Sequence, residues 1–176
     1  MNTSLVLTLL GSDRPGLVEA VAKVVHAHEG NWLESRMSRL ANKFAGVLLV
    51  SVPEGRADGL IAELGELRSS GLSIMVERAD TPAEEAPRSR WRLDLEGQDR
   101  PGIVSQVSRI LAGLGVSVDE LATAWRDAPM AGGTLFTARA ELHLPPNVRS
   151  ADVQKALEAI AQDLMVEIAI ADKPSS

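Results

Sequence analysis

The alternation of apolar and polar residues is clearest in the segment 90–96. Apolar side chains at positions 91, 93 and 95 are separated by charged ones, and this period of two predicts a half-buried strand. The residues that follow the first strand of each half are apolar at helical spacing. These sets are Leu17, Val18, Val21, Val24 and Val25 in one half, and Ile103, Val104, Val107, Ile110 and Leu111 in the other. Each half therefore begins with a strand and a helix.

Two strands, a second helix and a closing strand complete the pattern in each half. We expect strands at 32–40 and 44–52 with a tight hairpin between them, and at 116–126 and 134–144 with a longer loop. The second helices are predicted by Leu60, Ile61, Leu64 and Leu67, and by Val153, Leu157 and Ile160. The closing strands are expected at 73–78 and 165–171. We expect Gly30 and Gly115 to end the first helices as left-handed residues.

The chain contains two related halves. Gly-Ser-Asp-Arg-Pro-Gly-Leu-Val at 11–18 returns as Gly-Gln-Asp-Arg-Pro-Gly-Ile-Val at 97–104, an offset of 86 residues. Later features match at an offset of 92, which pairs Phe44 with Phe136, Pro53 with Pro145, Leu72 with Leu164, and Ile74 with Val166. The change of offset predicts an insertion in the second half, near 127–133.

The order strand, helix, strand, strand, helix, strand, occurring twice, predicts an α+β fold. We expect two ferredoxin-like (βαββαβ) domains, each an antiparallel four-stranded sheet with two helices on one face. The predicted boundaries are 1–80 and 89–172, with a Pro-containing linker at 81–88 and a tail at 173–176. Val6 and Leu10 fall on the uncovered face of the first sheet. This favours packing between the halves or a homo-oligomer.

Composition narrows the classes of function. The chain has 18 Lys and Arg against 24 Asp and Glu, a formal net charge of −6, which argues against direct binding to nucleic acid or to anionic membranes. The absence of cysteine excludes disulfides, thiolate catalysis and Cys-based zinc sites. No apolar run has the length of a membrane span, and the N-terminal segment lacks the basic start of a signal peptide. The expected location is the cytoplasm.

The Asp-Arg-Pro-Gly turn is the strongest candidate for a binding site. We expect its proline in the first helical turn, its aspartate as a cap of the free amides, and its glycine to permit close approach. Amides at a helix start suit a carboxylate or phosphate, and the aspartate suits an ammonium group. The candidates are Asp13, Arg14, Pro15, Gly16 and Leu17, and Asp99, Arg100, Pro101, Gly102 and Ile103. The residues alone support equally well a purely structural helix cap in each half.

Other polar residues are weaker candidates. The amide of Asn31 suits both ends of an amino acid, but a turn residue is the commoner role, and the second half has Val116 and Ser117 there. His26 and His28 point to different sides of a helix and His143 lies on a later strand, so no metal site is expected. No catalytic or cofactor-binding motif occurs. We therefore expect neither an enzyme nor a cofactor.

The repeated unit, with Asp-Arg-Pro-Gly after its first strand, resembles the ACT domain, a small regulatory module that binds amino acids. The resemblance covers about residues 5–171, and the stretches 30–37, 44–46 and 129–136 are similar to a subfamily of two-domain ACT regulators of transcription. It implies a non-enzymatic sensor that binds a small amino acid, glycine or serine, at a domain interface through both turns and Asn31. It also implies a DNA-binding transcriptional activator protein as partner, without direct contact to DNA. The alternative is a ligand-free ACT scaffold or oligomerisation module.

Overall fold

The computed structural model describes residues 1–79, 90–127 and 133–172. The chain divides into two compact units, residues 1–84 and 85–176, which we call unit 1 and unit 2. The expected linker at 81–88 and tail at 173–176 lie outside the described residues. Each unit is therefore described by itself.

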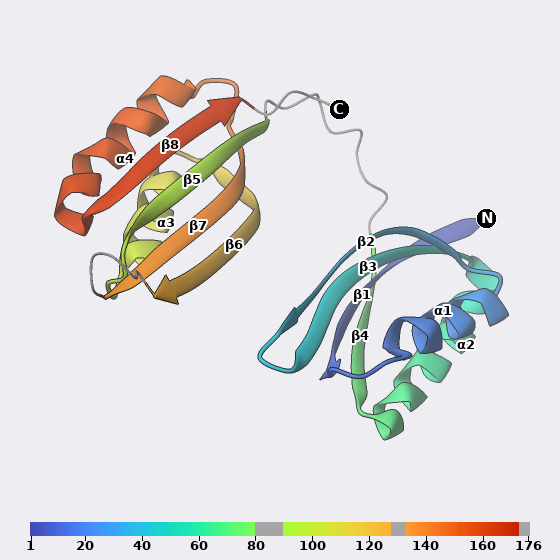
Figure 1. Ribbon diagram of the computed structural model, residues 1–176. Coiled ribbons are helices and arrows are strands. Elements are labelled where there is room, and N and C mark those ends of the chain that lie inside the picture. The colour runs from blue at the N-terminus through green and yellow to red at the C-terminus, as the bar shows by residue number, and fades with distance from the viewer. Residues whose placement is uncertain (80–89, 128–132, 173–176) are drawn as a thin grey trace. The chain divides into compact units, whose positions relative to one another are not determined.

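Unit 1 has the predicted order of elements (Figure 1). They are β1 (Asn2–Ser12), α1 (Leu17–Ala27), β2 (Asn31–Leu40), β3 (Lys43–Pro53), α2 (Glu54–Glu66), the 3-10 helix η1 (Leu67–Ser70) and β4 (Leu72–Arg78). The strands form an antiparallel sheet, sheet 1, in the order β2-β3-β1-β4. Both long helices lie on one face of it (Figure 1).

Unit 2 repeats this architecture. Its elements are β5 (Arg90–Gln98), α3 (Ile103–Gly113), β6 (Ser117–Asp127), β7 (Thr134–His143), α4 (Ser150–Leu164) and β8 (Val166–Asp172). The strands form sheet 2 in the order β6-β7-β5-β8, again antiparallel. The predicted α+β fold, with two four-stranded sheets and interleaved helices, is confirmed.

The core of each unit lies between its sheet and its helices. In β1, Leu5, Leu7 and Leu9 are at most 1% exposed because alternate residues of a strand face the same side. Leu93 and Leu95 of β5 hold the same place in unit 2. Helical spacing puts Leu17 and Val21 of α1 onto the leucines of β1.

The strand registers test the proposed repeat. Gly11 of β1 pairs with Phe44, and Gly97 of β5 pairs with Phe136, so the offset of 92 is confirmed for β3 and β7. Gly11 also pairs with Leu72 and Gly97 with Val166. Leu72 therefore corresponds to Val166, and the predicted matches of Leu72 to Leu164 and Ile74 to Val166 are wrong by two residues. The second helical segment is thus also longer in unit 2.

The end of the first helix differs between the two units. Gly115 has a φ of 70°, as predicted, but in unit 1 the left-handed residue is Glu29, with a φ of 58°. Gly30 is required for another reason: a Cβ there would lie 2.8 Å from the carbonyl oxygen of Val25. The expectation that Gly30 supplies the left-handed cap is wrong, and its role is close approach to α1.

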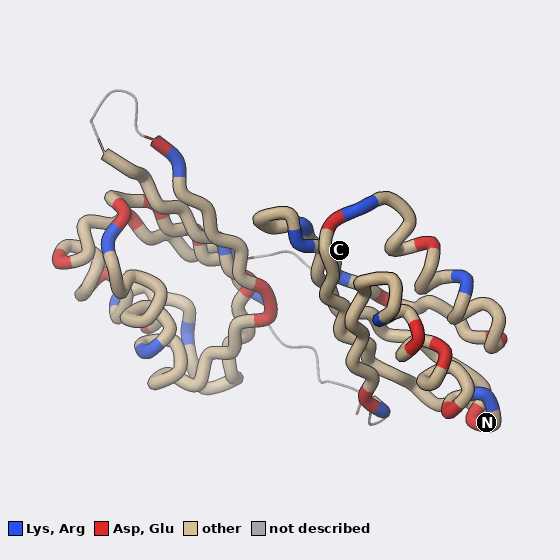
Figure 2. Tube along the Cα trace, turned by 90° about the horizontal axis from the view of Figure 1, so that it is seen from below, with Lys and Arg blue, Asp and Glu red and all other residues tan. Residues whose placement is uncertain are grey.

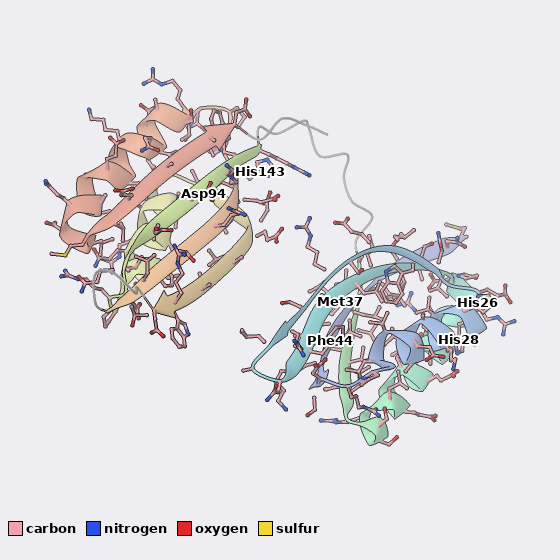
Figure 3. The ribbon with its side chains drawn as sticks, in the orientation of Figure 1. His26, His28, Met37, Phe44, Asp94 and His143 are labelled. Atoms are coloured by element: carbon pink, nitrogen blue, oxygen red, sulfur yellow. The ribbon has the colours of Figure 1, made fainter. Side chains whose placement is uncertain are left out.

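The outer faces of the two sheets, opposite the helices, differ in polarity. The outer face of sheet 1 exposes apolar side chains, including Leu10 and Met75. On sheet 2, Asp94 lies in the middle of the sheet (Figure 3) and accepts hydrogen bonds from Nε of Arg92 at 2.7 Å and Nε of Arg139 at 2.8 Å. The Arg139 guanidinium, with Arg92, holds the pKa of Asp94 below its ordinary value.

We expect Gly30→Ala to lower the free energy of unfolding by roughly 1–3 kcal/mol, because its methyl group would overlap the Val25 backbone. Gly65→Ala is the matched control: it lies in α2 with no heavy atom within 4 Å of the added Cβ. Because alanine is a better helix former than glycine, Gly65→Ala should raise the free energy of unfolding by up to about 1 kcal/mol. Urea denaturation measures both, and equal stability of the two variants would contradict the packing assigned to Gly30.

We expect Asp94→Asn to cost at most about 1 kcal/mol of stability at pH 7, because its ion pairs are partly exposed. The folded pKa is lowered, so this stabilisation is complete above the unfolded pKa of about 3.9 and is lost as the pH falls through the folded value. The difference from the native chain should therefore shrink below about pH 4. Urea denaturation at pH 7 and pH 3 checks this, with exposed Glu167→Gln as the control. A stability difference between the native chain and Asp94→Asn that is equal at pH 7 and pH 3 would refute this prediction.

Candidate functional site

Each candidate turn places a left-handed glycine at the helix start. Helix α1 begins at Leu17 after Gly16, whose φ is 90°, and α3 begins at Ile103 after Gly102, whose φ is 96°. Pro15 therefore lies before the helix, and the expectation of a proline in the first helical turn is wrong. The chain reverses between strand and helix, and this requires a conformation that glycine adopts most easily.

The aspartates of the turns do not cap the helices. Neither helix has a side-chain hydrogen bond at its N-cap, so the predicted capping role of Asp13 and Asp99 is wrong. Ala20 N–H donates to the carbonyl of Gly16 at 2.9 Å, and Gln106 N–H to that of Gly102 at 2.9 Å. The amides that precede them in each helix have no intrahelical acceptor. They carry the positive end of the helix dipole, which attracts anions.

A backbone hydrogen bond ties each turn to the neighbouring hairpin. Asp13 N–H donates to the carbonyl of Asn42 at 2.9 Å, between β2 and β3. In unit 2, Asp99 N–H donates to the carbonyl of Thr134 at 2.8 Å, at the start of β7. The antiparallel pairing of β1 with β3 brings these segments together, since the end of one strand meets the start of the other. Arg14 adds a side-chain hydrogen bond to the carbonyl of Ser70.

The charged surroundings of the two turns differ. In unit 1, Nη1 of Arg39 lies 3.2 Å from Oδ2 of Asp13. Arg39 pairs with Phe44, and Trp125 pairs with Phe136 in unit 2, so Trp125 occupies the position of Arg39. Asp99 has no ion pair with any residue that the structure describes. The strand position that carries a guanidinium beside the carboxylate of the first turn thus carries an indole in unit 2.

Both turns are open to a ligand. No heavy atom lies within 4 Å of a Cβ built on Gly16, and Gln106 Nε2 lies 3.7 Å from one built on Gly102. Residues 13–16 and 99–102 are exposed. Leu17 and Ile103 are 4% and 2% exposed, so their side chains belong to the core. At these two positions only the backbone amide is available to a ligand.

Asn31 lies away from the turn within unit 1. It pairs with Ser51, which pairs with Ser4 near the start of β1, whereas Asp13 follows the end of that strand. Eight residues of strand separate Ser4 from Ser12, a distance of about 27 Å. The structure therefore does not bring Asn31 to the turn of its own unit. Sequence reasoning overlooked Arg39 and Trp125, which the hairpin register places there.

Unit 2 has hollows on its surface. One is an open depression of about 730 Å³ on the outer face of sheet 2, lined partly by Asp94, Glu96 and Arg139. An apolar cavity of about 30 Å³ lies between α3 and the sheet, with Ile103, Val118 and Leu121 in its wall. Trp32 corresponds to Val118 and packs against the core of unit 1. The smaller valine leaves this space in unit 2.

The histidines lie apart from the turns. His26 and His28 are on and just after α1, and His143 is in unit 2 (Figure 3). Nε2 of His28 is 2.8 Å from Oε2 of Glu63, and Nδ1 of His143 is 3.5 Å from Oδ2 of Asp119. Within 1–79, 90–127 and 133–172, no group of three or more acidic or histidine side chains could hold a metal ion. No helix in those ranges has the length and apolarity to cross a membrane.

Comparison with known proteins identifies the class to which this architecture belongs. Residues 3–77, almost all of unit 1, match the ACT domain family. Unit 1 is therefore an ACT domain, and unit 2 repeats the same βαββαβ fold.

Two curated relatives cover most of this chain. It is 24% identical over 163 residues to the glycine cleavage system transcriptional repressor of Escherichia coli (strain K12), covering 91% of this chain and 85% of the repressor. It is also 27% identical over 173 residues to the phosphoserine phosphatase SerB2 of Mycobacterium tuberculosis, but this covers only 41% of the phosphatase. The similarity is to a transcriptional repressor along most of its length and to part of an enzyme.

Two solved structures share the fold over the whole chain. An unknown protein from Galdieria sulphuraria has a TM-score of 0.83 and 29% identity, with 98% of this chain and 99% of that one covered. A putative glycine cleavage system transcriptional repressor has a TM-score of 0.75 and 18% identity, with 99% of each chain covered. Both contain the tandem arrangement in a single chain.

We expect the Asp13–Arg39 pair to couple weakly. A double-mutant cycle with Asp13→Ala and Arg39→Ala should give a coupling free energy of about 0.2–1 kcal/mol, since Arg39 is largely exposed. The coupling should decrease in 0.5 M salt because screening weakens exposed pairs. Denaturation of the four proteins measures it. A coupling of zero at low salt would contradict the expectation that the pair stabilises the fold.

Proposed function

We propose that this protein is an amino-acid-responsive regulator without catalytic activity of its own. The observation that carries the proposal is the uncapped start of α1 and α3, each behind a left-handed glycine in an open turn. The free amides suit the carboxylate of a small amino acid such as glycine or serine. The match of unit 1 to the ACT domain family and the similarity to a transcriptional repressor support a regulatory role.

In this proposal the ligand lies across the turn, with its carboxylate on the helix amides and its ammonium toward the aspartate. The contact residues are those of Asp13–Leu17 and Asp99–Ile103, with Leu17 and Ile103 contributing only their amides. Asn31 joins such a site only from another unit or another copy, because its own turn is at the other end of the sheet.

The two turns are not equivalent in this function. At the first turn, a ligand ammonium competes with Arg39 for Asp13. At the second, Asp99 is free of such a pair among the described residues, and Trp125 adds an aromatic surface that attracts cations. The second turn therefore binds the amino acid more tightly.

The regulator acts through a protein partner in the cytoplasm, a DNA-binding transcriptional activator, rather than on DNA. The net charge of −6 supports this, because phosphate backbones attract basic surfaces. Acidic and basic positions are interspersed over both units, without a long run of basic ones (Figure 2). The amino acid changes partner binding only to the extent that it binds one state of the protein better than another.

Calorimetry of the full chain with glycine and serine tests the proposal. We expect binding at millimolar ligand or below, with Asp99→Ala weakening it at least tenfold and Asp13→Ala weakening it less. Asp163→Ala on α4 is the control for a lost surface charge and should leave the affinity unchanged.

Three results would count against this function. The absence of both heat and thermal shift at 10 mM of either amino acid would leave the ligand-free scaffold as the better description. Unchanged affinity in both aspartate variants would exclude the turns as the site. A larger loss for Asp13→Ala than for Asp99→Ala would reverse the assigned order of the two turns.

A further inference from the structure

The outer face of sheet 1 exposes a continuous apolar surface, which we call the apolar face. Leu10, Val47 and Met75 of this face are 53%, 49% and 64% exposed. The strand registers place Val6 beside Leu49 and Leu10 beside Ala45, so that these residues are neighbours across β1, β3 and β4. The complete set is Val6, Leu10, Ala45, Val47, Leu49 and Met75.

Among the described residues, charged side chains lie at the border of the apolar face: on the edge strands β2 and β4, and at Lys43, the first residue of β3. Glu34 and Arg36 are on the edge strand β2 and lie within 3.5 Å of each other. Glu77 is on the opposite edge strand, β4, where it pairs with Val6. Thr8 is the polar residue in the middle. This arrangement of an apolar centre within a polar rim is typical of a protein interface.

The fold itself does not require this face to be apolar, because unit 2 has the same fold with a charged one. At the positions corresponding to Val6, Leu10, Val47 and Leu49, sheet 2 has Arg92, Glu96, Arg139 and Glu141. Those side chains include the ion pairs around Asp94. The apolar residues of sheet 1 therefore serve a purpose that sheet 2 lacks.

Unit 2 offers no matching cover for the apolar face. Its own outer face would have to bury the charges around Asp94, which costs more than the contact returns. Its large exposed apolar side chains are Val104 on α3, Met165 just before β8, and Val118, Leu121 and Trp125 on the edge strand β6. Those on β6 form a strip one strand wide, which is too narrow for an apolar face that spans three strands.

The area fits a second copy of the same face. The whole outer face of sheet 1 consists of four strands of 7 to 11 residues. Treated as flat, it measures about 19 Å by 34 Å, roughly 600 Å². A standard stable interface buries about 800 Å² on each partner. Stacking of the whole outer face of sheet 1, the apolar face together with its polar rim, thus approaches what a dimer needs, and covering the apolar face alone does not.

We propose that two copies of this chain associate through the apolar faces of their first units, with the sheets stacked face to face around a two-fold axis. The same patch then serves on both copies, as in isologous dimers. Stacked sheets of this kind lie about 10 Å apart with their strands close to aligned, and their side chains interdigitate. This association does not depend on amino acid binding at the turns.

Sedimentation equilibrium of the full chain in the absence of amino acids tests the proposal. We expect the native protein to be dimeric at micromolar concentration and Met75→Glu to raise the dissociation constant at least tenfold, because a charge enters the buried face. Val47→Glu should have the same effect. Both positions are exposed in the single chain, and β4 already carries Glu77 on this face, so the fold should tolerate the changes. Circular dichroism verifies that it does.

Ala169→Glu is the matched control, because Ala169 pairs with Asp94 on sheet 2 as Met75 pairs with Thr8 on sheet 1. It should leave the dimer unchanged. A native chain that is monomeric at 100 μM would overturn the proposal, whether unit 2 or another protein covers the face. A dimer that resists both Met75→Glu and Val47→Glu would overturn it as well, since its interface must then lie elsewhere.

Discussion

Each unit depends on the burial of alternate side chains of its central strand beneath two helices. Leu5, Leu7 and Leu9 of β1 leave almost no surface to water, and Leu93 and Leu95 repeat this in β5. Removing a buried leucine from such a position leaves a cavity and typically costs several kcal/mol. Because β1 and β5 each pair with two neighbours, they fix the register of the sheet, and the register sets the position of the turn that follows.

Most of the fold could be predicted from the sequence. The strand period of two and the helical period are both clear, and the repeat shows each of them in both halves. The observed strands agree with the expected ones to within a residue or two at their ends. The errors arose where one residue type can meet more than one structural requirement. Gly30 is required by the Val25 carbonyl rather than by its own φ, and Glu29 takes the left-handed conformation. Sequence patterns do not contain such contacts between backbone segments.

The candidate site was predicted as a location but not as a set of interactions. The twin turns are open and lie at helix starts, but their glycines, not their aspartates or prolines, form the junction. Strand pairing across the hairpin brings Arg39 to the first turn and places Trp125 at the matching position of unit 2, which a linear motif does not show. Asn31 is separated from the turn for the same reason, because β2 enters the sheet at the opposite end. The duplication thus preserves the scaffold and changes the side chains around it.

The hydrogen bond from the first residue of each turn to the hairpin has a consequence for how the protein tolerates change. Asp13 and Asp99 hold Asn42 and Thr134 through main-chain atoms alone. Any amino acid other than proline supplies the same N–H group at positions 13 and 99, so this connection persists through nearly every substitution of these two donors. The side chains at positions 13 and 99 can consequently change to suit a ligand, while the main-chain hydrogen bond between turn and hairpin is retained.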